Sequence, residues 1–195
     1  MRTYVMSDIH GMYNKFMLML EKLQFSSADR LYVLGDLVQR GPDSVNVVRE
    51  IMHRENVEAI MGNHDRMALD FRDPEIFADR EVVEYLRKLP LYKEIEIAGQ
   101  KYILVHAGLG AFSKEKKLES YSEGELTWTR TDYTKTYFED IIVITGHTPT
   151  QKIPHNPYPG KIVRMNNHIA IDCGAPFKHG CLAALCLETG DEFYV

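Results

Sequence analysis

The sequence predicts an α/β protein built from two mixed β-sheets that pack face to face, with helices on the outside. In the first half of the chain, short apolar runs alternate with amphipathic stretches, as strand, helix, strand, helix, strand, helix. The second half consists mostly of strand-like runs. The 195 residues favour a single domain over residues 1–195, because domains average about 150 residues. A chain of this size buries about 70% of its unfolded surface, so we expect any metal to serve chemistry and not folding.

The expected strands are apolar runs bounded by turn-forming residues. They are Thr3–Met6, Arg30–Leu34, Val57–Met61, Lys93–Ile97, Tyr102–Val105, Ile141–Thr145, Ile162–Met165, His168–Ile171 and Leu182–Leu187. Helices with apolar residues at helical spacing are expected at Lys15–Leu23, Ser44–Arg54 and Glu81–Leu89. Hairpin turns are expected near Gly99-Gln100 and Asn166-Asn167. Residues 107–140 are predicted to be the least regular segment, and the proline-rich stretch Pro149–Pro159 is predicted to be an ordered loop.

Composition excludes several classes of protein. The chain is 45% hydrophobic and 26% charged, which is typical of globular proteins. Its net charge of −5 argues against a nucleic-acid partner. The apolar run at the amino terminus is too short for a signal peptide, and no run reaches the roughly 20 residues of a membrane span. The three cysteines have no metal-site spacing, so we expect reduced thiols in a cytoplasmic protein without membrane contact. Its oligomeric state is left open.

The strongest chemical signal is a set of polar residues where five predicted strands end. Each motif combines Asp, His or Asn with a nearby glycine. The motifs are Asp8-Ile9-His10-Gly11, Gly35-Asp36-Leu37, Gly62-Asn63-His64-Asp65, His106-Ala107-Gly108 and Gly146-His147-Thr148-Pro149. Ligands of open α/β sheets bind outside the carboxyl ends of the strands, and glycine lets the backbone turn sharply or approach a ligand closely. We therefore expect all five motifs to converge on one edge.

The side chains at this edge predict a site for two divalent metal ions. The candidate ligands are Asp8, His10, Asp36, Asn63, His106 and His147. Oxygen and imidazole donors without thiolates suit Mn²⁺, Fe²⁺ or Zn²⁺; we expect Mn²⁺, with iron, zinc and nickel as alternatives. Six groups exceed the four of a tetrahedral site, so two ions sharing a bridging Asp36 are favoured. One such motif alone would more often be a turn or a hydrogen-bonded histidine, but four of the eight histidines share this setting.

In this order, the five motifs resemble those of the calcineurin-like metallophosphoesterases, and most closely the phosphoprotein phosphatase branch with its bacterial and phage-type members. The resemblance implies the four-layer sandwich of that family. It implies that Asp8, His10 and Asp36 hold one metal, and that Asp36, Asn63, His106 and His147 hold the other. It also implies that Arg40 and a second arginine, taken to be Arg130 of Trp128-Thr129-Arg130, grip the phosphate. His64 would be the general acid, and a metal-bridging hydroxide would attack phosphorus directly.

Three positions bear on the branch of the family. Pro149 stands where many phosphodiesterases and nucleases have a further histidine. Gln39 replaces the aspartate that usually orients the acid histidine, so either His64 is a weaker acid or Asp65 or Asp43 takes that role. The sequence from Arg40 to Ser44, together with Asp65 after His64, looks like that of the symmetric diadenosine tetraphosphatases.

The favoured function from the sequence is a Ser/Thr protein phosphatase that acts on phosphoproteins or small phosphomonoesters. The short chain favours it, because few residues remain to cover a nucleotide. The alternative is a symmetric bis(5'-nucleosyl)-tetraphosphatase. A catalytically silent scaffold of the same fold is the remote alternative, and the presence of all six candidate ligands argues against it.

Overall fold

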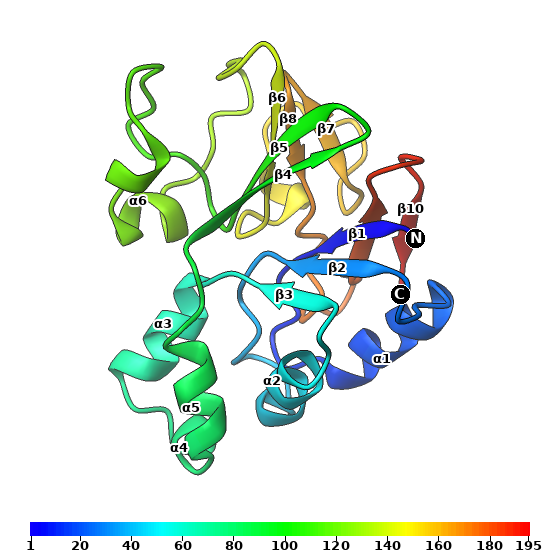
Figure 1. Ribbon diagram of the computed structural model, residues 1–195, viewed down its shortest axis with the longest axis vertical. Coiled ribbons are helices and arrows are strands. Elements are labelled where there is room, and N and C mark those ends of the chain that lie inside the picture. Colours follow the sequence, from blue (N-terminus) through cyan, green and yellow to red (C-terminus); the bar gives the residue numbers. More distant parts are fainter.

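Two five-stranded mixed sheets face each other in the computed structural model, which describes residues 1–195 (Figure 1). The first sheet has the order β10 (Glu192–Tyr194), β9 (Ala183–Cys186), β1 (Thr3–Met6), β2 (Arg30–Val33), β3 (Val57–Ala59). The second has the order β4 (Tyr92–Ile97), β5 (Gln100–Val105), β6 (Ile141–Thr145), β8 (His168–Ala170), β7 (Val163–Met165). Three neighbouring strands are parallel in each sheet, β1, β2 and β3 in the first and β5, β6 and β8 in the second. The remaining pairings are antiparallel. The predicted fold class is confirmed.

Alternate residues of β1 show why the two sheets form a sandwich. Val5 packs into a cluster between the sheets together with Leu104 and Ile144 of the second sheet. Tyr4 and Met6 point the other way, into the largest apolar cluster, which the outer helices complete. A strand buried on both faces needs a continuous apolar sequence, and β1 is buried at all four positions.

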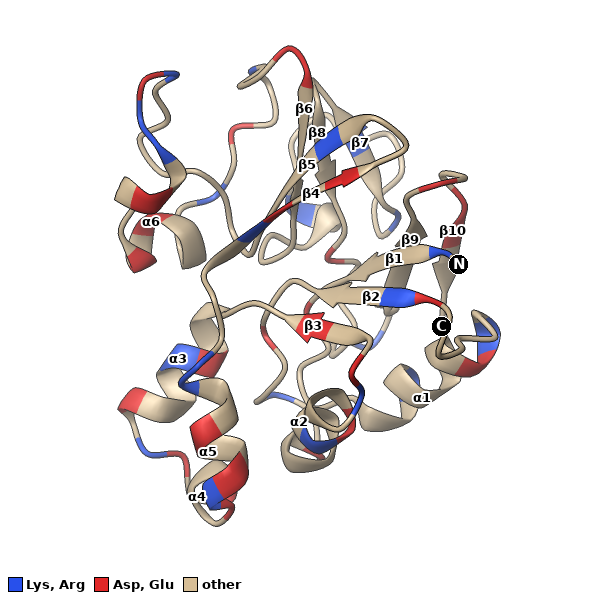
Figure 2. Ribbon diagram, in the orientation of Figure 1, with Lys and Arg blue, Asp and Glu red and all other residues tan.

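Helices cover both outer faces of the sandwich (Figure 1). The helices are α1 (Tyr13–Lys22), α2 (Ser44–Met52), α3 (Asn63–Asp70), α4 (Pro74–Phe77), α5 (Arg80–Leu86) and α6 (Glu123–Thr127). Two 3₁₀ turns lie at Leu118–Ser120 and Thr150–Lys152. Acidic and basic side chains share the surface of α5, whereas the charged residue of α4 is acidic (Figure 2). No helix has the length and hydropathy that crossing a bilayer would require.

Some elements were absent from the sequence-based prediction. The segment 107–140 is largely irregular, as predicted, but it also contains the short helix α6, which begins with a capping box between Ser122 and Glu125. The short edge strand β10 was not predicted. Helix α3 was missed because its buried face contains the polar residues Asn63 and Asp65, which do not register as an apolar stripe.

Candidate metal centre

The five motifs lie together at the carboxyl ends of strands from both sheets. Eight of the nine predicted site residues line one cavity of about 180 Å³. They are Asp8, His10, Asp36, Arg40, Asn63, His64, Arg130 and His147. The ninth residue, His106, is fully buried behind them, and its Nε2 lies 2.9 Å from Asn63 Oδ1. The first sheet thus presents four candidate ligands, and the second sheet presents His106 and His147.

Four of the six candidate ligands have a left-handed backbone, which non-glycine residues rarely adopt. The φ angles are 53° at Asp8, 50° at His10, 53° at Asp36 and 61° at His147. Such conformations cost roughly 1–3 kcal/mol each and cluster at functional sites. Their concentration around one cavity indicates that the backbone there is strained in order to position the side chains of a functional site.

Two glycines bring the strand ends close enough to share a site. A Cβ atom on Gly146 would lie 1.8 Å from Ser7 Oγ and 2.2 Å from Asp8 Oδ2. A Cβ atom on Gly62 would lie 2.2 Å from the backbone nitrogen of Asp36. No side chain fits at either position, so glycine is required there for close approach.

Asp36 occupies the centre of the candidate ligands. Its Oδ2 lies 3.4 Å from His10 Nε2, and its Oδ1 lies 3.4 Å from His106 Nε2. On the His106 side, Asn63 Oδ1 also lies 2.8 Å from His147 Nδ1. On the His10 side, Asp8 Oδ1 lies 3.8 Å from His10 Nε2. One carboxylate therefore faces two separate groups of donor atoms, as a bridging ligand must.

The histidine tautomers leave lone pairs directed at this carboxylate. His106 Nδ1 donates a hydrogen bond to the Leu34 carbonyl at 2.6 Å, and His10 Nδ1 donates to the Val38 carbonyl at 3.1 Å. Burial lowers the pKa of His10 to about 3, so this ring is neutral and its Nε2 carries a lone pair. A lone pair and a carboxylate oxygen repel each other unless a cation lies between them. Carbonyl-oriented imidazoles are also the usual arrangement of histidine metal ligands.

The buried acidic groups give a second test of whether cations fit. Asp8, Asp36 and Asp172 are 2%, 2% and 4% exposed. The ion-pair partners of Asp8 and Asp36 are histidines alone. Burial raises the pKa of both carboxyl groups well above the usual range, and burial raises the pKa of Asp172 to about 6. Buried carboxylates without cations are costly, so the donor set fits divalent metal ions.

Donor atoms of His10, Asp36 and His64 lie within 4.8 Å of one another, as do those of Asp36, His106 and His147. The first of these groups contains His64, which the sequence predicts to be an acid. Both ring nitrogens of His64 already have protein partners, Gln39 and Arg40. Asp8 therefore remains our candidate for the third ligand on that side.

His64 contacts Arg40 and Gln39. Its Nδ1 donates to Gln39 Oε1 at 2.7 Å, and its Nε2 accepts from Arg40 Nη2 at 2.9 Å. Burial, followed by the charge of Arg40, lowers the pKa of His64 to about 4. Gln39 Nε2 in turn donates to Asp73 Oδ2 at 3.4 Å. Gln39 therefore orients the His64 imidazole, and the Asp73 carboxylate contacts Gln39 and not the imidazole itself.

The suggestion that Asp65 or Asp43 contacts His64 in place of the usual aspartate was wrong. Asp65 is fully buried and accepts hydrogen bonds at 2.9 Å from the backbone N–H groups of Asp36, Leu37 and Gly62. It ties the motif after β2 to the motif after β3. Asp43 accepts from the Asn46 side chain instead.

Sequence reasoning assigned no role in the site to Trp128, Lys152, Asp172 and Phe177, which also line the cavity. Asp172 carries the same signal as the other motifs, because it follows the apolar strand β8 and precedes Gly174. The positions of the other three depend on loops, whose course the sequence does not reveal.

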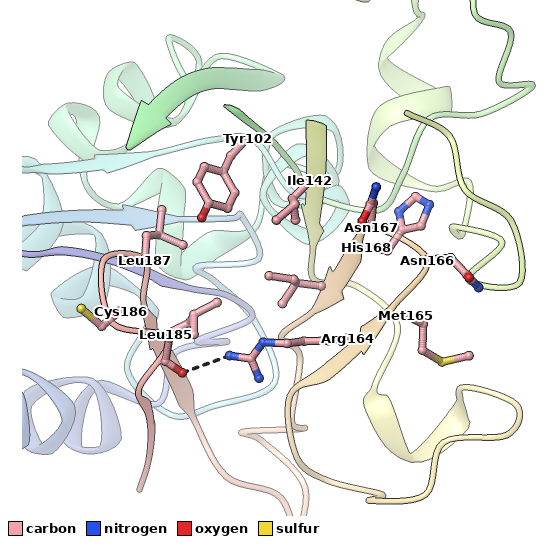
Figure 3. Close-up of a pocket in the computed structure, with 12 residues that line it drawn as sticks. Tyr102, Ile142, Arg164, Met165, Asn166, Asn167, His168, Leu185, Cys186 and Leu187 are labelled. Atoms are coloured by element: carbon pink, nitrogen blue, oxygen red, sulfur yellow. Dashed lines mark hydrogen bonds between the residues drawn. The ribbon is translucent and has the colours of Figure 1, made fainter. Parts of the chain in front are cut away.

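A larger cavity of about 400 Å³ lies near the amino-terminal ends of β5 and β6 (Figure 3). Tyr102 and Ile142 contribute apolar side chains. Its arginine, Arg164, donates to the Gly190 carbonyl at 3.1 Å and pairs with Glu192. Because its guanidinium is already paired and it holds no cluster of metal-ligating side chains, this cavity lacks the chemistry of the cavity around Asp36.

The fold and the site together define a metal-dependent phosphoesterase. The chain belongs to the calcineurin-like phosphoesterase family, whose sequence model matches residues 1–181. A symmetrical bis(5'-nucleosyl)-tetraphosphatase of Chromobacterium violaceum is 34% identical over 170 residues, which cover 77% of this chain and 58% of that protein. One from Erwinia tasmaniensis is 35% identical over 125 residues, which cover 56% of this chain and 45% of that protein. The matches with such relatives span from 24% to 58% of their lengths.

A crystal structure of a putative diadenosine tetraphosphatase has a similar fold, with a TM-score of 0.77 and 24% identity. The match covers 100% of this chain and 92% of that one. At this level of identity the likeness concerns the fold alone.

Proposed function

We propose that this protein hydrolyses dinucleoside polyphosphates with the help of two divalent metal ions, and that it cleaves them symmetrically. The observation that carries the hydrolytic role is the placement of Asp36 between two groups of ligands, with Arg40 and Arg130 in the same cavity. The curated relatives, named as symmetrical bis(5'-nucleosyl)-tetraphosphatases, support this substrate class. They favour the alternative of the sequence analysis over the Ser/Thr phosphatase.

In this proposal Asp8, His10 and Asp36 hold one ion, and Asp36, Asn63, His106 and His147 hold the other. When bound, the ions supply Lewis-acid activation of water and of the phosphoryl oxygens. We infer Mn²⁺ as the working ion, from a donor set of oxygen and imidazole that suits Mn²⁺, Fe²⁺ and Zn²⁺. The free thiols of the three cysteines fit a reducing compartment such as the cytoplasm.

Arg40 and Arg130 bind phosphate oxygens, because a planar guanidinium matches two of them at once. Arg40 now donates to His64 Nε2; with substrate bound, it turns to the phosphate and leaves Nε2 free to carry a proton. Water adds to phosphorus, the bridging P–O bond breaks, and His64 gives its proton to the leaving oxygen. One dinucleoside tetraphosphate and one water thus give two nucleoside diphosphates.

The acid role of His64 predicts a dependence on the leaving group. The His64→Asn variant should lose about 100-fold in kcat on an alkyl phosphate, whose leaving oxygen needs a proton. On p-nitrophenyl phosphate the loss should be less than about tenfold, because nitrophenolate leaves without protonation. The measurement is kcat on both substrates, with the exposed His53→Asn as the matched control. Equal losses on both substrates would contradict the acid role.

The Ser/Thr phosphatase remains a second candidate because of one observation. The cavity of about 180 Å³ is smaller than typical cavities for drug-sized ligands, which are about 300 Å³ or more. It therefore has room for the phosphate group of a phosphoprotein, while the rest of that protein stays outside the cavity.

A substrate panel separates the two candidates. The metal-free protein is loaded with Mn²⁺ and assayed on diadenosine tetraphosphate, a phosphothreonine peptide and p-nitrophenyl phosphate. We expect kcat/KM to be highest on diadenosine tetraphosphate, with ADP as the sole nucleotide product. A higher kcat/KM on the peptide, or ATP and AMP as products, would contradict the proposal. No hydrolysis of any substrate would favour the silent scaffold.

A further inference from the structure

Two exposed aromatic rings lie at the rim of the catalytic cavity. Trp128 is 50% exposed and Phe177 is 44% exposed, and both line the cavity. What sets these two rings apart is their place beside the charged centre of a cavity, because apolar groups rimmed by polar residues mark ligand-binding grooves. The other strongly exposed aromatic side chains, Phe71 and Tyr158, do not line it.

The two rings stand on different walls of the cavity. The Trp128 ring lies 6.2 Å from the ring of His147, at the end of a strand of the second sheet. The Phe177 ring lies 5.8 Å from the guanidinium carbon of Arg40, which follows a strand of the first sheet. The rings therefore lie beside different residues of the site, Trp128 beside His147 and Phe177 beside Arg40, which contacts His64.

Both rings are carried by ordered backbone. Trp128 follows α6, and Arg66 of α3 forms an ion pair with Glu123 at the start of α6. Phe177 lies in a tight turn, where its N–H donates to the Gly174 carbonyl at 2.9 Å and its carbonyl accepts from Gly180 N–H at 3.0 Å. Ordered backbone reduces the entropy lost when a ligand stacks on the rings.

The charges between the rings fit a polyphosphate. Arg40, Arg130 and Lys152 all line the cavity and are exposed. A cavity of about 180 Å³ does not hold a nucleoside together with its phosphates, so a bound nucleoside extends to the rim, which the two exposed rings line. Cations at the centre and aromatic faces on two sides match a chain of phosphates with a base at each end.

We propose that Trp128 and Phe177 form a base clamp, in which each ring stacks one base of a dinucleoside polyphosphate whose central phosphates lie beside Asp36. The clamp rests on the proposed function and adds to it the groups that select a substrate with two bases. Stacking tolerates any base, because every base has a π-face. Symmetric placement of the two bases sets the bridging bond between the middle phosphates over the catalytic residues.

The test compares ADP with pyrophosphate as inhibitors of p-nitrophenyl phosphate hydrolysis, at a fixed concentration of free metal. Both ligands carry a diphosphate, and only ADP carries a base. The wild-type protein should bind ADP about tenfold more tightly than pyrophosphate, from the stacking of one base. In Trp128→Ala and in Phe177→Ala this ratio should fall, and in the double variant it should approach one. Trp128→Phe should restore the ratio, because it restores an aromatic face.

Phe71→Ala and Tyr158→Ala are the matched controls, since they remove exposed rings away from the cavity, and they should leave the ratio unchanged. Trp128 is the single tryptophan of the chain, so its fluorescence gives an independent readout with the diamagnetic Zn²⁺ form. ADP should quench it, and pyrophosphate should not.

Equal inhibition by ADP and pyrophosphate in the wild-type protein, or an ADP preference that survives in the double variant, would overturn the clamp. Failure of the proposed function gives a different result. The protein would then cleave p-nitrophenyl phosphate and leave diadenosine tetraphosphate intact, while the ratio of the two inhibitors would still decide whether the rings bind a base.

Discussion

Replacing Asp36 by asparagine should lower kcat for p-nitrophenyl phosphate hydrolysis by about 1,000-fold or more, because this carboxylate faces both groups of metal ligands. An amide has one neutral oxygen donor and cannot bridge two cations as a carboxylate does. The remaining oxygen can still accept the hydrogen bond that His64 N–H donates to Asp36 Oδ1 at 2.8 Å. The fold should therefore survive the substitution.

The stability of the Asp36→Asn variant distinguishes lost metal binding from misfolding. Burial raises the pKa of Asp36 above its value in the unfolded chain, so its charge destabilises the metal-free fold at neutral pH. The metal-free variant should accordingly melt at a higher temperature than the metal-free wild type. It should also lose the stabilisation that Mn²⁺ gives the wild type. The exposed Asp70→Asn serves as control, and activity within tenfold of wild type in Asp36→Asn would contradict the bridging role.

Replacing Asp65 by alanine should lower the free energy of unfolding by about 3 kcal/mol or more. The side chain is fully buried and accepts from the N–H groups of Asp36, Leu37 and Gly62. Alanine leaves these donors buried without partners, and each costs about 1 kcal/mol or more. Urea denaturation of the metal-free protein measures the loss. Asp70→Ala, an exposed substitution in the same helix, should change stability by less than about 0.5 kcal/mol.

A loss below about 1 kcal/mol in Asp65→Ala would show that other contacts hold the two motifs together. Asp65→Asn gives a graded comparison, because an amide keeps one acceptor oxygen. The free energy of unfolding of Asp65→Asn should therefore be lower than that of the wild type and higher than that of Asp65→Ala.

The sequence predicted the sandwich and the grouping of its polar motifs because both follow from simple periodicities. Successive residues of β1 pack into two different apolar clusters. Such a strand needs consecutive apolar residues, and this run can be recognised in the sequence. Carboxyl ends of parallel strands meet at one edge, so Asp8 and Asp36 could be expected to lie together. The structure adds what periodicity does not encode, such as the left-handed backbone at both residues.

Other features depended on contacts between distant parts of the chain. Asp65 bonds to backbone groups 28 and 29 residues away, and no local pattern marks such a partner. Helix α3 was hidden for the same reason, since polar residues fill its buried face to serve the site. The rim positions of Trp128 and Phe177 arise from two long connections, between β5 and β6 and between β8 and β9. The prediction of phosphomonoesters depended on chain length alone, whereas the base clamp that we propose depends on these two rings.

The most direct measurement is an anomalous-scattering map of Mn²⁺-loaded crystals at the manganese absorption edge. The account predicts two peaks about 3.5–4 Å apart, with an oxygen of Asp36 bound to each. One peak should adjoin His10, and the other should adjoin Asn63, His106 and His147. A single peak, or two peaks of which either lies beyond the reach of Asp36, would contradict the dinuclear site.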